Sequence, residues 1–466
     1  MQKTILSLTA LAIASVFGHM NDASADDGLL GWLENGSISG DERLYNFSKD
    51  FAGTASNTPA TTVFSGPKPL DFKDQNALSL GGKLKAQTGN WDGVSAAIAL
   101  YYAYDIGSNN YTYNNKPYYN VNYGYPYLNP FLMGTNRTLD TLGEAWLQYQ
   151  NSVFSVRGGR ELIDNPWVNS SDGFMIPNIY QGASLQVTPT PELTLNLDRV
   201  NEYKNRTTAD FNQNTLDVLP YDKLIDYGNT GGTFDAGATW KTDQAHLSAW
   251  LYDFNNIANM GYLEGGYRLP EAQQVFFANG QYVREVGTGV IGSVNADIYG
   301  IKTGMDLDHQ LGSVFVAYNA SANNTVNSLS ATPVSTVSGI VPSTNGNFYS
   351  PYTQIYNTDP LYTTVMNYGL VSARAAGYAW MLGSTLHLMG HSLDITPTIS
   401  EYYTAQNYLN KATNAANVRA YMLTSTWHFS GKLKGLTLLD QFGVEHDAPL
   451  LGTSFVENRF RLQYNF

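Results

Sequence analysis

Basic side chains recur at alternate positions in several stretches of the sequence. Residues two apart in an extended strand share a face, so these cations would lie on polar strand faces. A guanidinium group binds a carboxylate through two hydrogen bonds, and a lysine binds it as a point charge. A series of weak sites of this kind would let a carboxylate move along a water-lined wall. Alternation alone places six cations in this way: Lys83, Lys85, Arg157, Lys302, Arg459 and Arg461.

The same cations could instead form ion pairs with carboxylates on the same wall and only stabilise it. Candidate partners are Asp140, Glu144 and Glu457. The sequence leaves both interpretations open for each cation.

Three carboxylates, Glu161, Asp164 and Asp172, lie in a long connection near residues 161–178. If this connection folds inward, an acidic edge would face the basic wall and orient a zwitterion along its dipole. A solvated outer loop would also carry Asp and Asn, because these residues favour turns. We favour the inward-folded constriction.

Other chemistries find little support. The absence of cysteine excludes disulfides, thiolate zinc sites and cysteine nucleophiles, and a net charge of −13 disfavours nucleic-acid binding. No histidine lies in a recognisable nucleophile motif. His387 and His391 flank an expected β-turn, so helical spacing does not make them partners at a metal site. We therefore expect no enzyme activity, no cofactor and no metal.

The C-terminal residues indicate the element that must position such a wall. Phe460, Leu462, Tyr464 and Phe466 alternate with Arg459, Arg461, Gln463 and Asn465, which predicts a strand with one apolar and one polar face. The final Phe466, with Tyr464 two residues before it, resembles the assembly signal of outer-membrane β-barrels.

The N-terminal residues predict export. Lys3, the apolar run 5–17 and Ala23-Ser24-Ala25 form a secretory signal peptide over residues 1–25, followed by a single domain over residues 26–466. No later stretch is apolar for 18 residues, so the chain can cross a membrane only as a closed barrel. The 33 tyrosines suit the aromatic girdles of such a barrel.

Tight and long connections alternate along the chain, and about 18 strands can be counted, which averages roughly 24.5 residues per strand and connection. The predicted fold is all-β: a transmembrane antiparallel β-barrel with short periplasmic turns, long outer loops, some folded inward, and both termini periplasmic. The strand limits are least certain at 257–290, and residues 365–376 are either a strand or part of a folded-in loop.

Motifs in the first third of the domain are more specific. The runs 142–149 and 156–161 are followed by Asn165-Pro166, by Asp172-Gly173-Phe174-Met175-Ile176-Pro177-Asn178 and by 180–183. This order resembles the OprD-type substrate-specific outer-membrane porins. The stretch 43–51 resembles the family's first strand, and 431–437 resembles its final periplasmic turn. Members often have a basic residue just before the methionine, whereas this sequence has Phe174.

The resemblance implies an 18-stranded channel in the outer membrane of a Gram-negative bacterium, narrowed by inward-folded loops. It implies small carboxylate-bearing solutes and a row of basic residues on the inner wall. Arg160 is included in the predicted track mainly because of this resemblance. By alternation alone it would face the opposite side of the strand from Arg157. The implied partners are lipid and lipopolysaccharide, the barrel-assembly machinery, periplasmic chaperones and the solute; the protein would be a monomer or a homotrimer.

Three other functions are compatible with the predicted barrel to different degrees. A non-specific general diffusion porin would differ only in selectivity. A closed structural or adhesin barrel would fit the long loops, and single-channel conductance would distinguish it. A barrel enzyme, such as an outer-membrane phospholipase or protease, is disfavoured because no nucleophile motif is found.

Overall fold

The computed structural model describes the 18 long strands and part of the connections between them. The described residues are 32–33, 35–51, 75–107, 112–113, 116–117, 119–120, 125–126, 132–133, 138–213, 231–271, 274–288, 294–324, 348–353, 357–366, 368–373, 376–404, 416–446 and 454–466. The predicted signal peptide lies outside them and stays a prediction.

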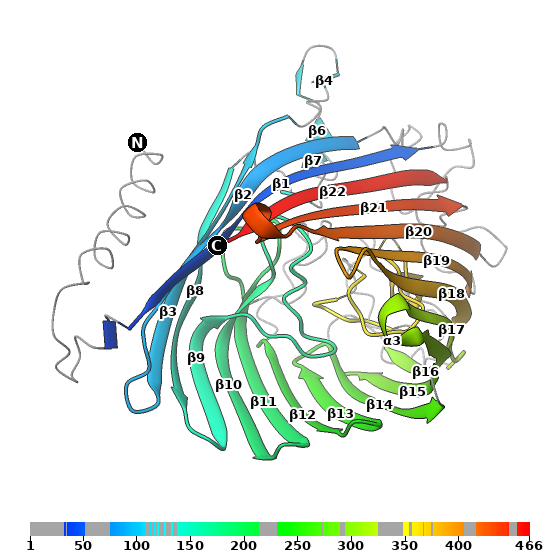
Figure 1. Cartoon of the computed structure of the whole chain (residues 1–466), viewed down its shortest axis with the longest axis horizontal. Coiled ribbons are helices and arrows are strands. Elements are labelled where there is room, and N and C mark those ends of the chain that lie inside the picture. Colours follow the sequence, from blue (N-terminus) through cyan, green and yellow to red (C-terminus); the bar gives the residue numbers. More distant parts are fainter. Residues whose placement is uncertain are drawn as a thin grey trace.

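The strands form one closed antiparallel sheet of 18 strands, as predicted. In chain order they are β1 (Ser37–Phe51), β2 (Gln75–Gln87), β3 (Val94–Asp105), β8 (Thr138–Gln150), β9 (Phe154–Glu161), β10 (Ile179–Thr190), β11 (Leu193–Lys204), β12 (Thr233–Lys241), β13 (Ala245–Phe254), β14 (Ala258–Glu271), β15 (Gln274–Gly287), β16 (Asn295–Leu307), β17 (Gly312–Ser321), β18 (Gly377–Leu388), β19 (Leu393–Thr404), β20 (Ala416–His428), β21 (Leu436–His446) and β22 (Phe455–Asn465). Each strand pairs with its neighbours in sequence, and β1 pairs with β22 to close the barrel (Figure 1).

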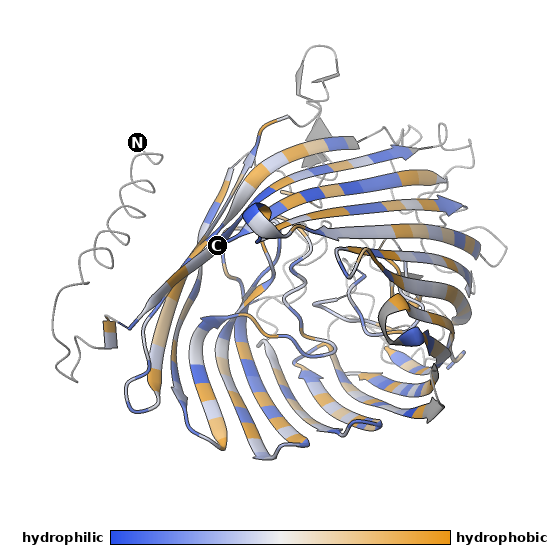
Figure 2. Ribbon diagram, in the orientation of Figure 1, coloured by the Kyte–Doolittle hydropathy of each residue, from blue (hydrophilic) through white to orange (hydrophobic). Residues whose placement is uncertain are grey.

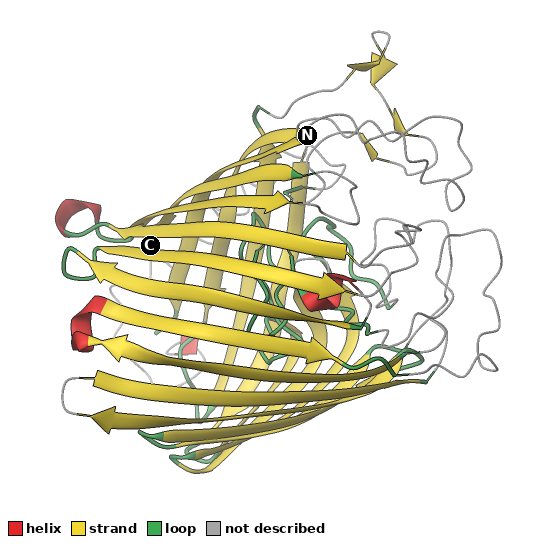
Figure 3. Cartoon of the chain, turned by 90° about the vertical axis from the view of Figure 1, so that its right-hand side faces the viewer, coloured by secondary structure: helices red, strands yellow, loops and turns green. Residues whose placement is uncertain are grey.

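The remaining elements are short. Two pairs of two-residue strands lie in the connection between β3 and β8: β4 (Thr112–Tyr113) with β5 (Lys116–Pro117), and β6 (Tyr119–Asn120) with β7 (Tyr125–Pro126). Helix α3 (Asp308–Leu311) and the 3₁₀ turn η3 (Gly431–Leu433) join strands at the end where the C-terminus lies (Figure 3). No helix among the described residues is long and apolar enough to cross a membrane.

Side chains alternate between the two faces of the wall. On β13, Trp250, Tyr252 and Phe254 are buried inside, whereas Leu247 and Leu251 are 50% and 69% exposed on the outside. Figure 2 shows the same alternation of hydrophobic and hydrophilic residues along neighbouring strands. An apolar exterior of this kind suits contact with lipid, because the closed sheet satisfies the backbone hydrogen bonds internally.

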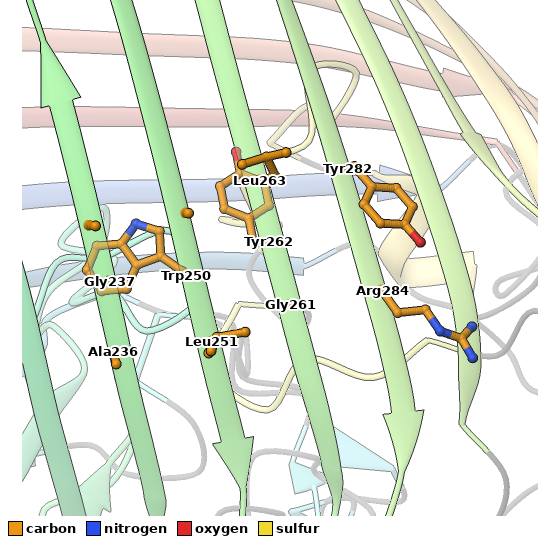
Figure 4. A pocket seen from close by; sticks show the side chains of 11 residues that line it. Ala236, Gly237, Trp250, Leu251, Gly261, Tyr262, Leu263, Tyr282 and Arg284 are labelled. Atoms are coloured by element: carbon orange, nitrogen blue, oxygen red, sulfur yellow. The ribbon is translucent and has the colours of Figure 1, made fainter.

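Glycine and alanine leave a shallow groove on this exterior. It has a volume of about 570 Å³ and lies over β12–β15, where Ala236, Leu251, Leu263 and Arg284 line it (Figure 4). The guanidinium group of Arg284 lies 3.0 Å from a carboxylate oxygen of Asp297. Leu251 and Leu263 are exposed on the outside of the wall, so the groove belongs to the outward-facing surface and not to the barrel interior.

Two connections fold inward, as predicted for some of the long loops. We call residues 162–178 the first inner loop and residues 348–373 the second inner loop. The first packs Phe174, Met175 and Ile176 against residues of β1 and β3. The second packs against the inner faces of strands from β11 to β20. Of the stretch 365–376, left open by the sequence, the described residues 365–366 and 368–373 belong to this loop and include helix α4 (Leu370–Ala373).

Candidate functional site

The first inner loop is held to the wall by an ion pair. Arg43 on β1 donates hydrogen bonds of 2.5 and 2.9 Å to the two carboxylate oxygens of Asp172. Arg43 also donates to Asp41, at 2.6 Å, and to the carbonyl oxygen of Phe174, at 2.8 Å. A planar guanidinium suits such two-fold contacts with carboxylates. The fork of Arg43 therefore anchors the loop at its tip.

The carboxyl group of Asp172 is stabilised in its charged form. Its burial would raise its pKa, but the hydrogen bonds from Arg43 and the charges of Arg43 and Lys83 outweigh that effect. The pKa of Asp172 consequently lies below its ordinary value. Asp172 is ionised at neutral pH, and the loop presents a negative charge to the wall.

Five cations surround residues 172–174, and we call them the basic cluster: Arg43, Lys83, Arg206, Arg459 and Arg461. The guanidinium carbons of Arg206 and Arg459 lie 4.5 and 4.9 Å from the centre of the Phe174 ring. Arg461 donates a long hydrogen bond of 3.3 Å to the carbonyl oxygen of Asp172. Its Nε atom is buried and has no hydrogen-bond partner in the described part of the chain.

Fewer carboxylates than cations contact this cluster. Asp41 and Asp172 bind Arg43, and Glu457 accepts a hydrogen bond of 2.7 Å from Arg459. Lys83 lies 3.7 Å from Asp41. Leaving Arg206 aside, the four described cations Arg43, Lys83, Arg459 and Arg461 therefore lie around three carboxylates, and this part of the site is net positive.

The strand registers place the cations of the wall one after another along the barrel. Lys49 lies opposite Glu457, Arg459 opposite Phe47, and Arg461 opposite Tyr45. Nearer the C-terminal end of β22, Arg43 lies opposite Gln463 and Lys83 opposite Asp41. Because residues two apart on a strand are about 7 Å apart, these cations form a row along β22, β1 and β2.

The other predicted track residues lie on the inner wall but away from the cluster. Lys85 forms an ion pair of 2.7 Å with Glu144. This contact is of the kind expected if the cation pairs with a carboxylate of the wall and stabilises it. Arg157 lies 3.7 Å from Glu161 and 4.3 Å from the ring of Trp146. Lys302 on β16 lies over the ring of Phe315, at 4.1 Å.

Arg160 does not face the lumen, which corrects the prediction. It lies opposite Ala145 and Gln181, and Ala145 shares the outward parity of Leu147, which is 58% exposed. The register of β9 is not shifted near Gly159, so no bulge turns Arg160 inward. Its guanidinium instead packs on Phe211, at 4.2 Å.

Asp140 is a second correction, because it also lies on the outward face. It pairs in register with Tyr102, whose neighbours Tyr101 and Ala103 are the inward, buried residues of β3. It therefore cannot neutralise a cation of the inner wall.

Of the three predicted constriction carboxylates, Asp172 alone contacts the basic cluster. Asp164 accepts hydrogen bonds of 2.9 and 2.6 Å from the backbone and side chain of Ser170, within the loop. Glu161 belongs to the end of β9, where Ser184 donates to it at 2.8 Å. The acidic edge predicted from the sequence is thus a single carboxylate at the loop tip.

Sequence reasoning missed Arg43 and Arg206. Arg43 alternates with Asp41, Tyr45 and Phe47, all buried on the inner face, so the period of two could have identified it. Arg206 follows β11 in a connection and has no strand periodicity. Nothing local in the sequence indicates that it reaches Phe174.

The two inner loops touch each other. Asn169 donates a hydrogen bond of 3.0 Å to the carbonyl oxygen of Thr358, and the rings of Trp167 and Phe348 lie 5.3 Å apart. Arg459 reaches the carbonyl oxygen of Met366 at 3.5 Å. The basic cluster therefore contacts both loops.

A closed barrel of 18 strands, with short turns at one end and long, inward-folded connections at the other, is the architecture of an outer-membrane porin. The family model described as outer membrane porin, OprD family, matches residues 141–340. The resemblance predicted from the sequence is thereby confirmed, and so is the location in the outer membrane. Since porins of this family are channels, the expectation that the chain is not an enzyme is confirmed as well.

Solved structures show the same fold at low sequence identity. OccK9 (OpdG) from Pseudomonas aeruginosa is 14% identical, with a TM-score of 0.70, over 94% of this chain and 99% of that one. A BenF-like porin from Pseudomonas fluorescens Pf-5 is 12% identical, with a TM-score of 0.69, over 93% and 99%. OccAB4 from Acinetobacter baumannii is 12% identical, with a TM-score of 0.68, over 94% and 99%. A comparison with curated proteins finds no match.

Proposed function

We propose that this channel passes small water-soluble solutes that carry a carboxylate, such as amino acids, small peptides or organic acids. The observation that carries the proposal is the net positive basic cluster at the tip of the first inner loop. Arg461 is its most weakly held member, because its side chain is only half-buried and, among the described residues, its hydrogen bond to Asp172 is long, at 3.3 Å, and its Nε has no partner. The guanidinium group of Arg461 could therefore turn to donate to the carboxylate of a solute.

The row of cations along β22, β1 and β2 supports passage as well as binding. Conduction requires sites that attract the solute but release it again. Each cation of the row except Arg461 is already close to a carboxylate of the wall or the loop, which weakens its attraction for a solute. A solute carboxylate could therefore exchange between neighbouring cations without being trapped.

The test compares a carboxylic acid with its uncharged amide of nearly the same size. The double variant Arg459→Gln/Arg461→Gln should slow the liposome uptake of the acid and leave the amide little changed. Each lost contact should weaken carboxylate binding by about 1 kcal/mol, or roughly fivefold. The difference should shrink at high salt, because the Debye length falls to about 3 Å at 1 M.

Arg160→Gln is the control, since it makes the same type of substitution on the outward face, with the loss of one positive charge, and should not change either rate. Equal slowing of acid and amide in the double variant would contradict the proposal. It would mean that the pore had only narrowed, and the general diffusion porin would then be preferred.

A further inference from the structure

The short turn between β18 and β19 has an unusual backbone. Met389, Gly390 and His391 have φ values of 51°, 64° and 66°. Residues other than glycine rarely adopt this left-handed conformation. The turn carries the exposed ring of His391 back over β18, so that the rings of His387 and His391 lie with centroids 4.9 Å apart. His387 and His391 are therefore neighbours, although they lie on the two sides of a turn and not on one face of a helix.

A carboxylate completes this group. Asp394 lies opposite His387 in the strand register, and its Oδ1 is 2.6 Å from Nδ1 of His387. The ligand atoms of His387, His391 and Asp394 all lie within 4.8 Å of one another. From the next strand, β20, Nε2 of His428 lies 3.6 Å from Oδ2 of Asp394.

His387 and Asp394 lie on the inner face of the wall at its periplasmic end, and His391 lies in the turn at that end. His387 shares the parity of the buried inward residues Ala379 and Met381, and Asp394 that of Ser400. The turn is one of the short connections at the end of the barrel where the C-terminus lies (Figure 3). The histidines are therefore open to periplasmic water at the mouth of the channel.

These residue types suit a particular class of ion. Imidazole and carboxylate together bind divalent transition metals such as Zn²⁺, whereas Mg²⁺ and Ca²⁺ prefer oxygen ligands alone. Zinc binds such atoms at about 2.0–2.2 Å, so its ligand atoms lie about 3.3 Å apart in a tetrahedron. The three ligand atoms lie within 4.8 Å of one another, which is about 1.5 Å wider than this spacing, and Nδ1 of His387 and Oδ1 of Asp394 lie closer than it, at 2.6 Å. Small side-chain rotations would complete the site and leave a fourth position for water.

We propose that His387, His391 and Asp394 bind a divalent transition-metal ion at the periplasmic mouth of the channel, and that His428 positions Asp394. Carboxylates that bind a metal usually also contact a second polar group that orients them, and Nε2 of His428 lies 3.6 Å from Asp394. A bound ion would raise the charge at the mouth by two units and shift the channel toward anions. The proposal departs from the sequence-based expectation of no metal site, and it does not depend on the proposed solute.

The central test replaces His391 by glycine. Glycine removes the ligand and also accepts a positive φ without strain, so the variant should fold and should not be less stable than the wild type. Titration of the untagged, folded protein with Zn²⁺ in a calorimeter should show one site. Loss of a residue that only supports a metal ligand lowers metal affinity by roughly 10- to 100-fold. Because His391 would itself be a ligand, we expect His391→Gly to lower the Zn²⁺ affinity by more than this.

His446→Gly is the control, because this histidine lies at the other end of β21, next to Tyr421, and its loss should leave Zn²⁺ binding unchanged. Mg²⁺ should not compete with Zn²⁺. A Cu²⁺-loaded sample should show magnetic coupling to two imidazole nitrogens, which His391→Gly reduces to one. Unchanged Zn²⁺ affinity in both His391→Gly and Asp394→Asn would overturn the proposal and leave the contacts as stabilisers of the turn.

Discussion

Phe174 shows how a single residue alters the chemistry of the inner loop. Members of the family that the sequence resembles often have a basic residue just before the methionine, whereas here the ring of Phe174 lies beneath the guanidinium groups of Arg206 and Arg459. Cation–π contacts of this kind contribute about 0.5–2 kcal/mol each. The positive charge at the constriction therefore comes from the wall and from Arg206, while the loop itself contributes the negative charge of Asp172.

Asp359 is a titratable residue that should make docking of the second inner loop depend on pH. Burial raises the pKa of its carboxyl group to about 6, against the effect of hydrogen bonds from Thr364 and from the backbone of Leu361. The docked loop thus holds the proton more tightly than the undocked loop. Docking is most favourable below about pH 4, weakens as the pH rises toward 6, and stays weaker above it.

Asp359→Asn should remove this dependence and stabilise the docked loop at neutral pH by up to about 3 kcal/mol. Closing events of single channels, counted at pH 4.5, 6 and 7.5, should vary with pH in the wild type and remain constant in the variant. Asp210→Asn, at an exposed position outside the loop, is the control. A variant that keeps the wild-type pH profile would show that Asp359 does not govern the loop.

At the scale of elements, the inner loops are held by a few long-range contacts. The first is fixed by Arg43 and by the burial of Phe174, Met175 and Ile176. The second packs a large set of tyrosine rings against the wall, including the pair Tyr368 and Tyr402 with ring centres 4.8 Å apart. The wall sets the positions of the loops, because the strands have a continuous backbone hydrogen-bond network and the loops do not.

The seam between β1 and β22 is the element that closes the barrel. Phe466 exchanges two backbone hydrogen bonds with Gly40, of 3.0 and 3.1 Å, at the end of this seam. Tyr464 and Phe466 stack on the exterior with ring centres 6.3 Å apart. A side chain at position 40 would collide with the Phe466 ring, since a Cβ atom there would lie 2.7 Å from it.

Deletion of Phe466 should lower the amount of protein assembled in the outer membrane more than it alters the conductance of assembled channels. The reason is that the deletion removes the last contacts of the seam and the aromatic residue of the predicted assembly signal. Quantitative blots of outer-membrane fractions, together with single-channel recordings, measure the two effects. Phe460→Leu, which keeps an apolar outward residue, is the control. Unchanged surface levels after the deletion would contradict the assembly role.

The barrel wall is a sheet without free edges, since each of its 18 strands has two partners. Such a sheet can open only if many hydrogen bonds break together. The folded protein should therefore resist detergent at room temperature and migrate faster on gels unboiled than boiled. Its circular-dichroism spectrum should be that of a β-protein. Identical migration with and without boiling would be incompatible with the closed barrel.

The sequence by itself determined the barrel, the number of strands and the face of most residues. A strand in lipid must alternate apolar and polar side chains, so the period of two is preserved locally, as at 459–466. The same rule placed Lys83, Arg157 and Arg461 on the inner wall, and it already set Arg160 apart from Arg157.

The tertiary structure decided which of these residues meet. Arg43 and Asp172 are 129 positions apart, and their contact depends on how a loop docks across the barrel. Arg206 reaches Phe174 from a connection without periodicity, and His391 reaches His387 through a turn of rare backbone conformation. The alternation of inward and outward side chains depends only on neighbours along one strand, so it can be predicted from the sequence. Loop docking and turn geometry depend on contacts between distant segments, which no local pattern records.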